Sequence, residues 1–219
     1  DAFAGLQRFN GSALSVRVSH PLDELRQKHL KETLSLTRAD IEAGLAANTS
    51  RSDAEKKAFT EFVAGVLNVM ESSVVSAHLN GFVESVPDDK DRFTTVAAFA
   101  APAAVDLNKI LPLLADAGKG NSVQMNLEKV GDVDIHRIQI AEGFVSTFDR
   151  VFGTHEDVFV GVSPQRVWMA TGPGGLESLK SAIPVIGEPA ANFVVLRVDG
   201  NLLPWAKLID SIAKKEKTG

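Results

Sequence analysis

Residues 158–183, with the sequence VFVGVSPQRVWMATGPGGLESLKSAI, contain two short apolar runs followed by a leucine-containing segment. Only Ser163-Pro164-Gln165 separates the two runs, and so short a link is typical of a hairpin between antiparallel strands. Gly172-Pro173-Gly174-Gly175 then ends the strand pattern, and a helix is predicted over 175–183. A hairpin followed closely by a helix indicates an α+β fold.

A second hairpin is predicted near the start of the chain, over residues 3–18. Asn10-Gly11 is a strong hairpin signal, because both central residues of a type I′ turn need a positive φ. Leu14, Val16 and Val18 alternate with polar residues, which gives the predicted strand one apolar face.

Hairpins and helices alternate along the rest of the chain. Ser52 and Glu55 form a capping-box pattern at the start of a helix that carries an apolar stripe. The other predicted elements are strands at 74–86, 92–100, 122–130, 133–140 and 193–198, a helix after Pro21, one from about 106 that contains Pro112, and one over 201–213. Together these elements predict an α+β fold with a largely antiparallel sheet, or sheets, and helices packed on one face.

Two short patterns occur twice in the same order. A proline bend followed by Leu-acid-x-Leu is found at 21–25 and, with glycines inserted, at 173–179. Val-Asp-x-Asn before a leucine-rich segment is found at 105–108 and 198–201. A structural duplication explains both patterns, and ordinary helix N-capping by Asp and Asn is the alternative explanation.

The length of 219 residues allows a sizeable core, and we predict a single domain over 1–219. If the duplication is real, the pseudo-repeats span 1–120 and 121–216. The first is then enlarged by a helical insertion near 37–86.

Composition excludes several classes of protein. The chain has 23 Lys and Arg against 28 Asp and Glu, a net charge of −5, and no long basic stripe, so nucleic acid is not an expected partner. It has no cysteine, which excludes disulfides, thiolate catalysis and cysteine-ligated metals. No stretch of about 18 uninterrupted apolar residues occurs, so no transmembrane segment is predicted.

The glycine-rich bend is one candidate binding site. Gly172, Gly174 and Gly175 lie between a predicted strand and a predicted helix, where backbone N–H groups and the helix dipole favour an anion. Trp168 lies four residues upstream and is included in this candidate ligand site. The bend lacks the Lys-Ser/Thr of a P-loop and the spacing of a dinucleotide fold, so a tight strand-to-helix turn is the alternative.

A metal site is the other candidate. Asp132, Asp134 and His136 cluster around one end of a predicted strand, and carboxylates with an imidazole are metal ligands. An exposed, solvated strand end is the alternative. No His-x-x-x-His pair and no nucleophile motif occurs, so we expect neither a catalytic residue nor a cofactor, and a non-catalytic domain is favoured over an enzyme.

Residues 158–162 (VFVGV) and 166–172 (RVWMATG), followed by a short leucine helix, resemble uncharacterised exported bacterial proteins. The resemblance covers mainly residues 93–213 and implies an exported protein of the periplasm or cell envelope of a bacterium. With the absence of catalytic motifs, it favours a non-catalytic domain that binds a protein partner or ligand. The alternatives are a hydrolase that uses carboxylates or an Asp/His metal site, and a carrier of an apolar ligand.

Overall fold

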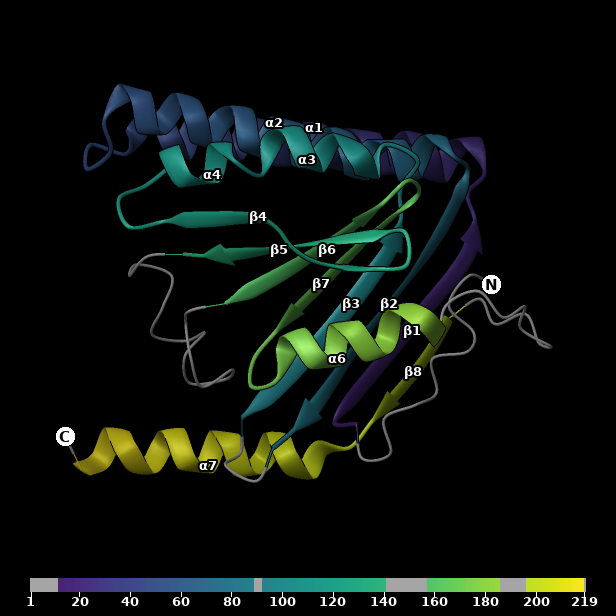
Figure 1. The fold of residues 1–219 in the computed structure, drawn as a ribbon, viewed down its shortest axis with the longest axis vertical. Coiled ribbons are helices and arrows are strands. Elements are labelled where there is room, and N and C mark those ends of the chain that lie inside the picture. The colour runs from purple at the N-terminus through teal and green to yellow at the C-terminus, as the bar shows by residue number, and fades with distance from the viewer. Residues whose placement is uncertain (1–11, 89–91, 141–156, 186–195, 219) are drawn as a thin grey trace.

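A computed structural model of the chain describes residues 12–88, 92–140, 157–185 and 196–218. Within these residues, eight antiparallel strands form one sheet in the order β4-β5-β6-β7-β3-β2-β1-β8. Figure 1 shows this sheet with α1 and α2 above it, α6 in front of it and α7 below it. The predicted α+β class with an antiparallel sheet is therefore confirmed.

The element boundaries follow the predicted pattern closely. The strands are β1 (Leu14–Pro21), β2 (His78–Pro87), β3 (Phe93–Ala100), β4 (Ser122–Val130), β5 (Val133–Gln139), β6 (Val158–Ser163), β7 (Arg166–Thr171) and β8 (Leu196–Gly200). The helices are α1 (Glu24–Ala47), α2 (Asp53–Val75), α3 (Leu107–Ile110), α4 (Leu113–Asp116), α6 (Gly175–Ala182) and α7 (Leu202–Thr218), with short 3-10 turns at Ala104–Asp106 and Ile183–Val185. The hairpin at Asn10-Gly11 lies outside the described residues.

Local chemistry explains several of these boundaries. The Ser52 hydroxyl accepts from the Glu55 N–H and the Glu55 carboxylate accepts from the Ser52 N–H, so the capping box at the start of α2 is confirmed. Gly131 adopts φ +61° in the turn between β4 and β5, as a tight hairpin requires. Pro112 separates α3 from α4, because proline cannot donate the backbone hydrogen bond that a continuous helix needs there.

The helices cover different parts of the two sheet faces, and we name each face by its main helix. On the α6 face, α6 packs over β3, β7 and β6 around a core that includes Trp168 and Leu179. On the α2 face, α2, α3 and α4 cover β5, β6 and part of β7 around Leu107, Val160 and Val167. Successive residues of a strand point to opposite faces, so the two cores draw on alternate residues of the same strands. The prediction that the helices pack on one face of the sheet is therefore wrong, because helices cover part of each face.

Gly161 makes room for the largest buried side chain of the α6 face. It lies directly opposite Trp168 in the β6–β7 pair. A Cβ atom at Gly161 would lie 3.0 Å from the Trp168 Cβ and 2.9 Å from the Val133 Cγ1. The Trp168 ring, 1% exposed, also meets the edge of the Phe82 ring with centroids 6.1 Å apart.

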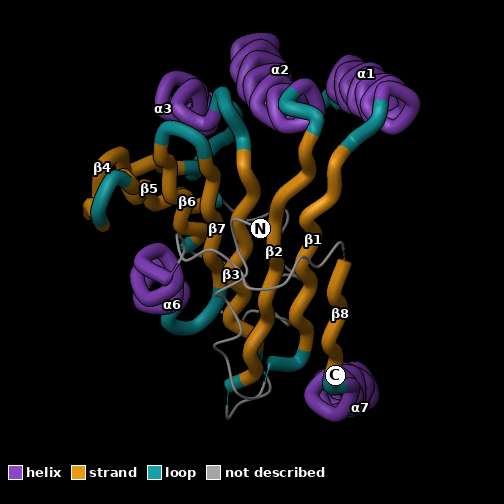
Figure 2. The backbone as a smooth tube through the Cα atoms, turned by 90° about the vertical axis from the view of Figure 1, so that its right-hand side faces the viewer, coloured by secondary structure: helices purple, strands orange, loops and turns teal. Residues whose placement is uncertain are grey.

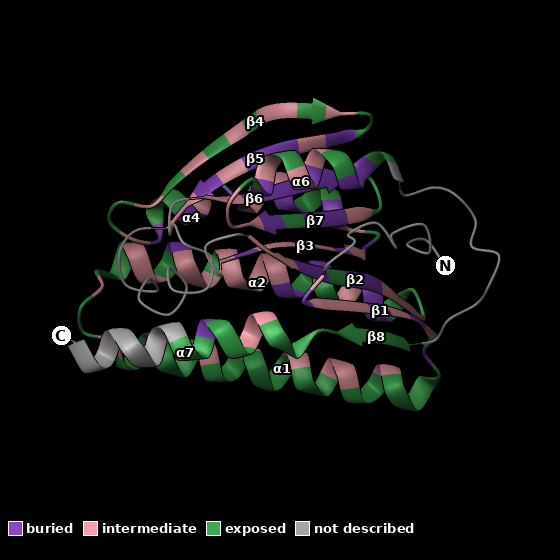
Figure 3. Ribbon diagram, turned by 90° about the horizontal axis from the view of Figure 1, so that it is seen from below, coloured by how far each residue is buried: buried purple, intermediate pink, exposed green. Residues whose placement is uncertain are grey.

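The long helix α1 lies on α2 and is otherwise largely exposed. Figure 3 shows α1 with exposed and half-buried residues along most of its length, and Leu45 is its one buried residue. Among the described residues, α2 alone is long and apolar enough to cross a membrane. The same length and composition are found in core helices, and α2 contributes Ala58 and Val69 to the core of the α2 face.

The two halves of the chain interleave within the sheet. β3 of the first half pairs with β7 of the second, and β8 of the second half pairs with β1 of the first. Figure 2 shows β8 at one edge of the sheet and β4 near the other, with α7 and α2 at opposite ends of the strands. The pseudo-repeats stay a prediction, although their boundary does not separate two independent sheets.

Candidate functional site

The glycine-rich bend forms a tight connection from β7 to α6. Gly172 has φ +93°, and a Cβ there would lie 2.0 Å from the Phe93 carbonyl oxygen. Gly174 has φ +71° at the N-cap of α6. The Gly175 N–H donates to the Gly172 carbonyl over 3.0 Å, so this group already has a partner within the bend. The glycines are therefore explained by backbone geometry, without a bound anion.

Trp168 does not extend this bend into a ligand site. Its ring is buried in the core of the α6 face, beneath α6. A ligand at the surface of the bend would not reach the ring without displacing core side chains. The structure gives the predicted ligand site no support beyond the glycine conformations.

The predicted metal residues are not gathered around one point. Asp132 lies in the exposed turn between β4 and β5, and the Asp134 carboxylate accepts from the Lys129 ammonium at 3.0 Å. His136 is fully buried, at 0% exposure. Within the described ranges, no three His, Asp or Glu side chains lie close enough to hold a metal ion.

His136 instead connects three elements by hydrogen bonds. The Asn126 N–H donates to its Nδ1 over 3.0 Å, so the ring proton is on Nε2, which lies 2.8 Å from the Asn108 Oδ1. Asn126 has φ +52° within an irregularity of β4 that places three residues opposite His136. Burial lowers the pKa of His136, and the nearby Asp134 only partly opposes this. Both ring nitrogens are therefore occupied, and the ring stays neutral near neutral pH.

The uncovered part of the α2 face carries a row of apolar side chains. In register across the sheet, Val198 of β8, Val16 of β1, Val83 of β2, Ala97 of β3 and Met169 of β7 lie side by side. Direct partners in antiparallel strands share a face, so all five point the same way. We call these five residues the open row.

The open row ends where the helices begin to cover the sheet. The next two residues in the same register are Val160 of β6 and His136 of β5, which are 5% and 0% exposed. In contrast, Val198, Val83 and Met169 are 59%, 39% and 46% exposed. Covered and open stretches are therefore parts of one continuous row across seven strands.

Another exposed apolar side chain adjoins the open row, and more are exposed on the helix that follows β8. Leu196 is 61% exposed and lies on the same face of β8 as Val198. The helix α7, which directly follows β8, exposes Leu202, Leu203 and Ile209. Single exposed apolar residues are ordinary on protein surfaces, whereas a gathered set of this kind marks an interaction site.

The α6 face of the same edge strands carries charges instead. Arg17 and Glu84 are 8% and 3% exposed, and Arg197 and Asp199 lie beside them on β8. Burial lowers the pKa of Arg17, an effect that the negative charge of Glu84 opposes. The Ser12 hydroxyl donates to the Glu84 carboxylate. This edge is thus apolar on one face and charged on the other.

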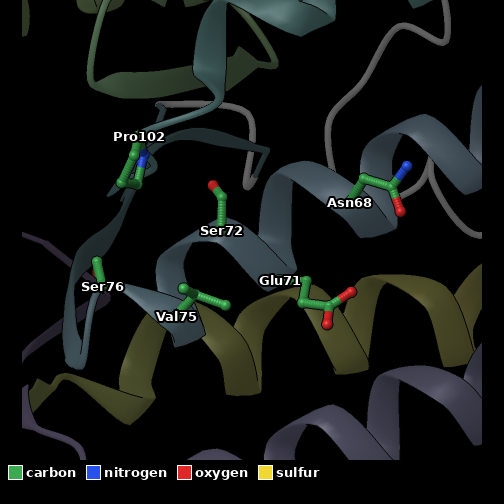
Figure 4. Close-up of a pocket in the computed structure, with 6 residues that line it drawn as sticks. All are labelled: Asn68, Glu71, Ser72, Val75, Ser76 and Pro102. Carbon is green, nitrogen blue, oxygen red and sulfur yellow. The ribbon is translucent and has the colours of Figure 1, made fainter.

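An open pocket of about 440 Å³ lies at the C-terminal end of α2, next to the end of β3. Figure 4 shows its lining residues: Asn68, Glu71, Ser72, Val75, Ser76 and Pro102. The Ser72 hydroxyl donates to the Val69 carbonyl and accepts from the Ala103 N–H, and the Ser76 hydroxyl donates to the Ser73 carbonyl. These hydroxyls hold the α2 terminus together, so the pocket offers no convergent set of polar groups for a ligand.

Comparison of the chain with protein-family models, curated proteins and solved structures found no match. Function must therefore be argued from the site itself. Sequence reasoning found the apolar face of β1, through Leu14, Val16 and Val18, but not the open row. The signal that was missing is the register, which brings residues from β8, β1, β2, β3 and β7 together.

Proposed function

We propose that this chain is a non-catalytic binding domain of a bacterial exported or cell-envelope protein and that it binds a protein partner through the open row. The observation that carries the proposal is the gathering of exposed apolar side chains along one sheet row. Burying apolar surface contributes about 25 cal/mol per Å², so a partner that covers this row gains binding free energy.

A protein partner fits the open row better than a small apolar ligand. The five residues lie in a line on a sheet surface, whereas small-molecule sites are concave and enclose most of the ligand. A line of apolar side chains matches the apolar stripe of an amphipathic helix, which binds through residues at helical spacing. The carrier of an apolar ligand is therefore not favoured.

Among the described residues, the two buried groups with shifted pKa values do not favour catalysis. His136 belongs to the α2 face and Arg17 to the α6 face, because they occupy positions of opposite parity in the strand register. A catalytic site brings groups with perturbed pKa values together in one cleft. These two groups project away from each other, and each is accounted for by its own surroundings.

Selection of peptides from a random phage-displayed library on the immobilised protein tests the proposal. We expect selected peptides to have an apolar stripe at helical spacing. Their affinity should fall about tenfold or more for Val83→Lys and for Met169→Lys, because each places a charge within the row.

Leu36→Lys is the matched control, since Leu36 is 67% exposed on α1, an element that contributes no residue to the row. It should leave peptide affinity unchanged. Peptides whose binding survives both row variants, or is lost equally in the control, would contradict the proposal. Circular dichroism of each variant checks that the fold is retained.

The exported location is supported by the resemblance of 158–162 and 166–172 to exported bacterial proteins. Cell fractionation of the organism that encodes the chain, followed by immunodetection, tests this part separately. Signal confined to the cytoplasmic fraction would contradict it without bearing on the open row.

A further inference from the structure

The two edges of the sheet differ in how well they could accept another strand. β4 forms one edge, and its irregularity around Asn126, with φ +52°, interrupts the regular backbone that a new strand would need. β8 forms the other edge and pairs with β1 without a register shift. No described strand lies on the outer side of β8.

The hydrogen bonds to β1 determine which backbone groups of β8 face outward. The Asn201 N–H donates to the Ala13 carbonyl over 3.0 Å, next to the Leu14–Gly200 pair. In an antiparallel pair, hydrogen-bonded and non-hydrogen-bonded positions alternate. Arg197 and Asp199 therefore direct their backbone groups to β1, and the backbone groups of Leu196, Val198 and Gly200 point away from the sheet.

The side chains of β8 are complementary to a second copy of the same strand. When β8 is placed antiparallel to itself about Val198, each Arg197 lies opposite the Asp199 of the other copy. In the single chain these two side chains pair with each other, with Nε and Oδ2 2.6 Å apart, and are 43% and 55% exposed. Arg197 also lies directly opposite Arg17, a like charge that a second Asp199 would offset.

We propose that β8 pairs antiparallel with β8 of a second copy of this chain, centred on Val198, and so joins two sheets into one. In this register the two Val198 residues face each other and exchange backbone hydrogen bonds. The Leu196 of each copy forms the neighbouring hydrogen-bonded pair with the Gly200 of the other. Val198 of each copy then lies beside its equivalent on the same face. The open rows of the two copies become one continuous row, so self-pairing doubles the surface proposed to bind a partner.

The dimer is expected to be weak and reversible. β8 has five residues, so the pairing buries less area than a standard stable interface. Leu196 and Val198, which are more than half exposed in the single chain, would lose part of this exposure. The exposed ion pairs make the association weaker at high salt.

Charge exchange at Arg197 and Asp199 tests the register. In Arg197→Asp, both cross-copy pairs become acidic, and in Asp199→Arg both become basic. Sedimentation velocity should show that the dimerisation affinity of either variant alone is lower than that of the unaltered chain by about tenfold or more. An equimolar mixture should form a heterodimer with about the original affinity, because each acidic position then faces a basic one.

Lys109→Asp is the control, because it removes another exposed ion pair, with Asp106, at 2.8 Å on a different element. It should leave the dimer unchanged. The proposal is overturned if the unaltered chain stays monomeric at millimolar concentration, if either single variant associates as strongly as the unaltered chain, or if the mixture forms no heterodimer.

Hydrogen exchange of the unaltered chain gives a second test that needs no variant. The N–H groups of Leu196, Val198 and Gly200 should become protected as the protein concentration rises. Those of Arg197 and Asp199 should be protected throughout, since they bond to β1. Protection that does not depend on concentration at the first three positions would overturn the proposed pairing.

Discussion

His136 shows how a single residue has its chemistry decided by its surroundings. From the sequence, His136 beside Asp134 suggested a metal ligand. In the fold, the Asn126 N–H and the Asn108 side chain occupy the two ring nitrogens, and the ring is fully buried. The buried ring joins β5 to β4 and α3, so its contribution is to stability.

The lowered pKa of His136 predicts a loss of stability in acid. A histidine whose pKa is lower in the folded state binds more protons when unfolded. Its contribution is complete above the ordinary value of 6.5 and falls as the pH decreases from 6.5 toward the lowered pKa. His136→Asn should reduce the free energy of unfolding at neutral pH by about 2 kcal/mol and flatten this acid dependence, as urea denaturation at several pH values would measure.

His29→Asn is the control for this measurement. The His29 side chain is 66% exposed on α1, so its replacement should leave the pH dependence of the unaltered chain in place. An unchanged acid slope in His136→Asn would show that the buried ring is not its source.

At the scale of elements, the described part of α7 contacts the sheet through one aromatic side chain and a buried leucine. The Trp205 ring stacks on Phe93, with centroids 4.3 Å apart and planes at 14°, and its Nε1 donates to the Ala13 carbonyl over 3.3 Å. Leu208, which is buried, joins this cluster from α7. Leu202 and Ile209, which lie one turn before and one turn after Trp205 on the same side of α7, are exposed.

Trp205→Ala should therefore loosen α7 without unfolding the sheet. We expect faster amide hydrogen exchange over residues 202–210 and unchanged exchange in β3 and β7, because stability varies among cooperative units of a protein. Leu203→Ala, at a position that is 61% exposed, should change stability by less than about 0.5 kcal/mol. Equal acceleration in β3 would mean that α7 and the sheet unfold as one unit.

At the scale of the whole molecule, the interleaved sheet predicts one cooperative unfolding transition. β3 and β7 join the two halves of the chain at the centre of the sheet, and Phe82 of the first half packs on Trp168 of the second. The chain has two tryptophans, so Trp205→Phe leaves Trp168 as the single fluorescent reporter of this junction. Its fluorescence and the far-ultraviolet circular dichroism should change at the same urea concentration.

Two separated transitions would instead indicate halves that are stable on their own, as a duplication with independent units requires. Trp168 can distinguish these outcomes because residues from both halves of the chain bury its ring. Phe82 comes from the half before the 120/121 boundary, and Leu179 comes from the half after it. Loss of one half would expose the ring.

The sequence by itself determined the α+β class, the antiparallel hairpins, the capping box of α2 and the break at Pro112, because each depends on residues close together in the chain. It also predicted glycine-rich turns, and Gly131 and Gly172 adopt the positive φ that such turns use. Only the tertiary structure decided which stretch of each apolar face is covered. The open row and the buried His136 belong to one register across seven strands, and that register depends on partners that are far apart in the chain. Alternation shows that a strand has an apolar face, but helix placement decides whether that face becomes core or binding surface.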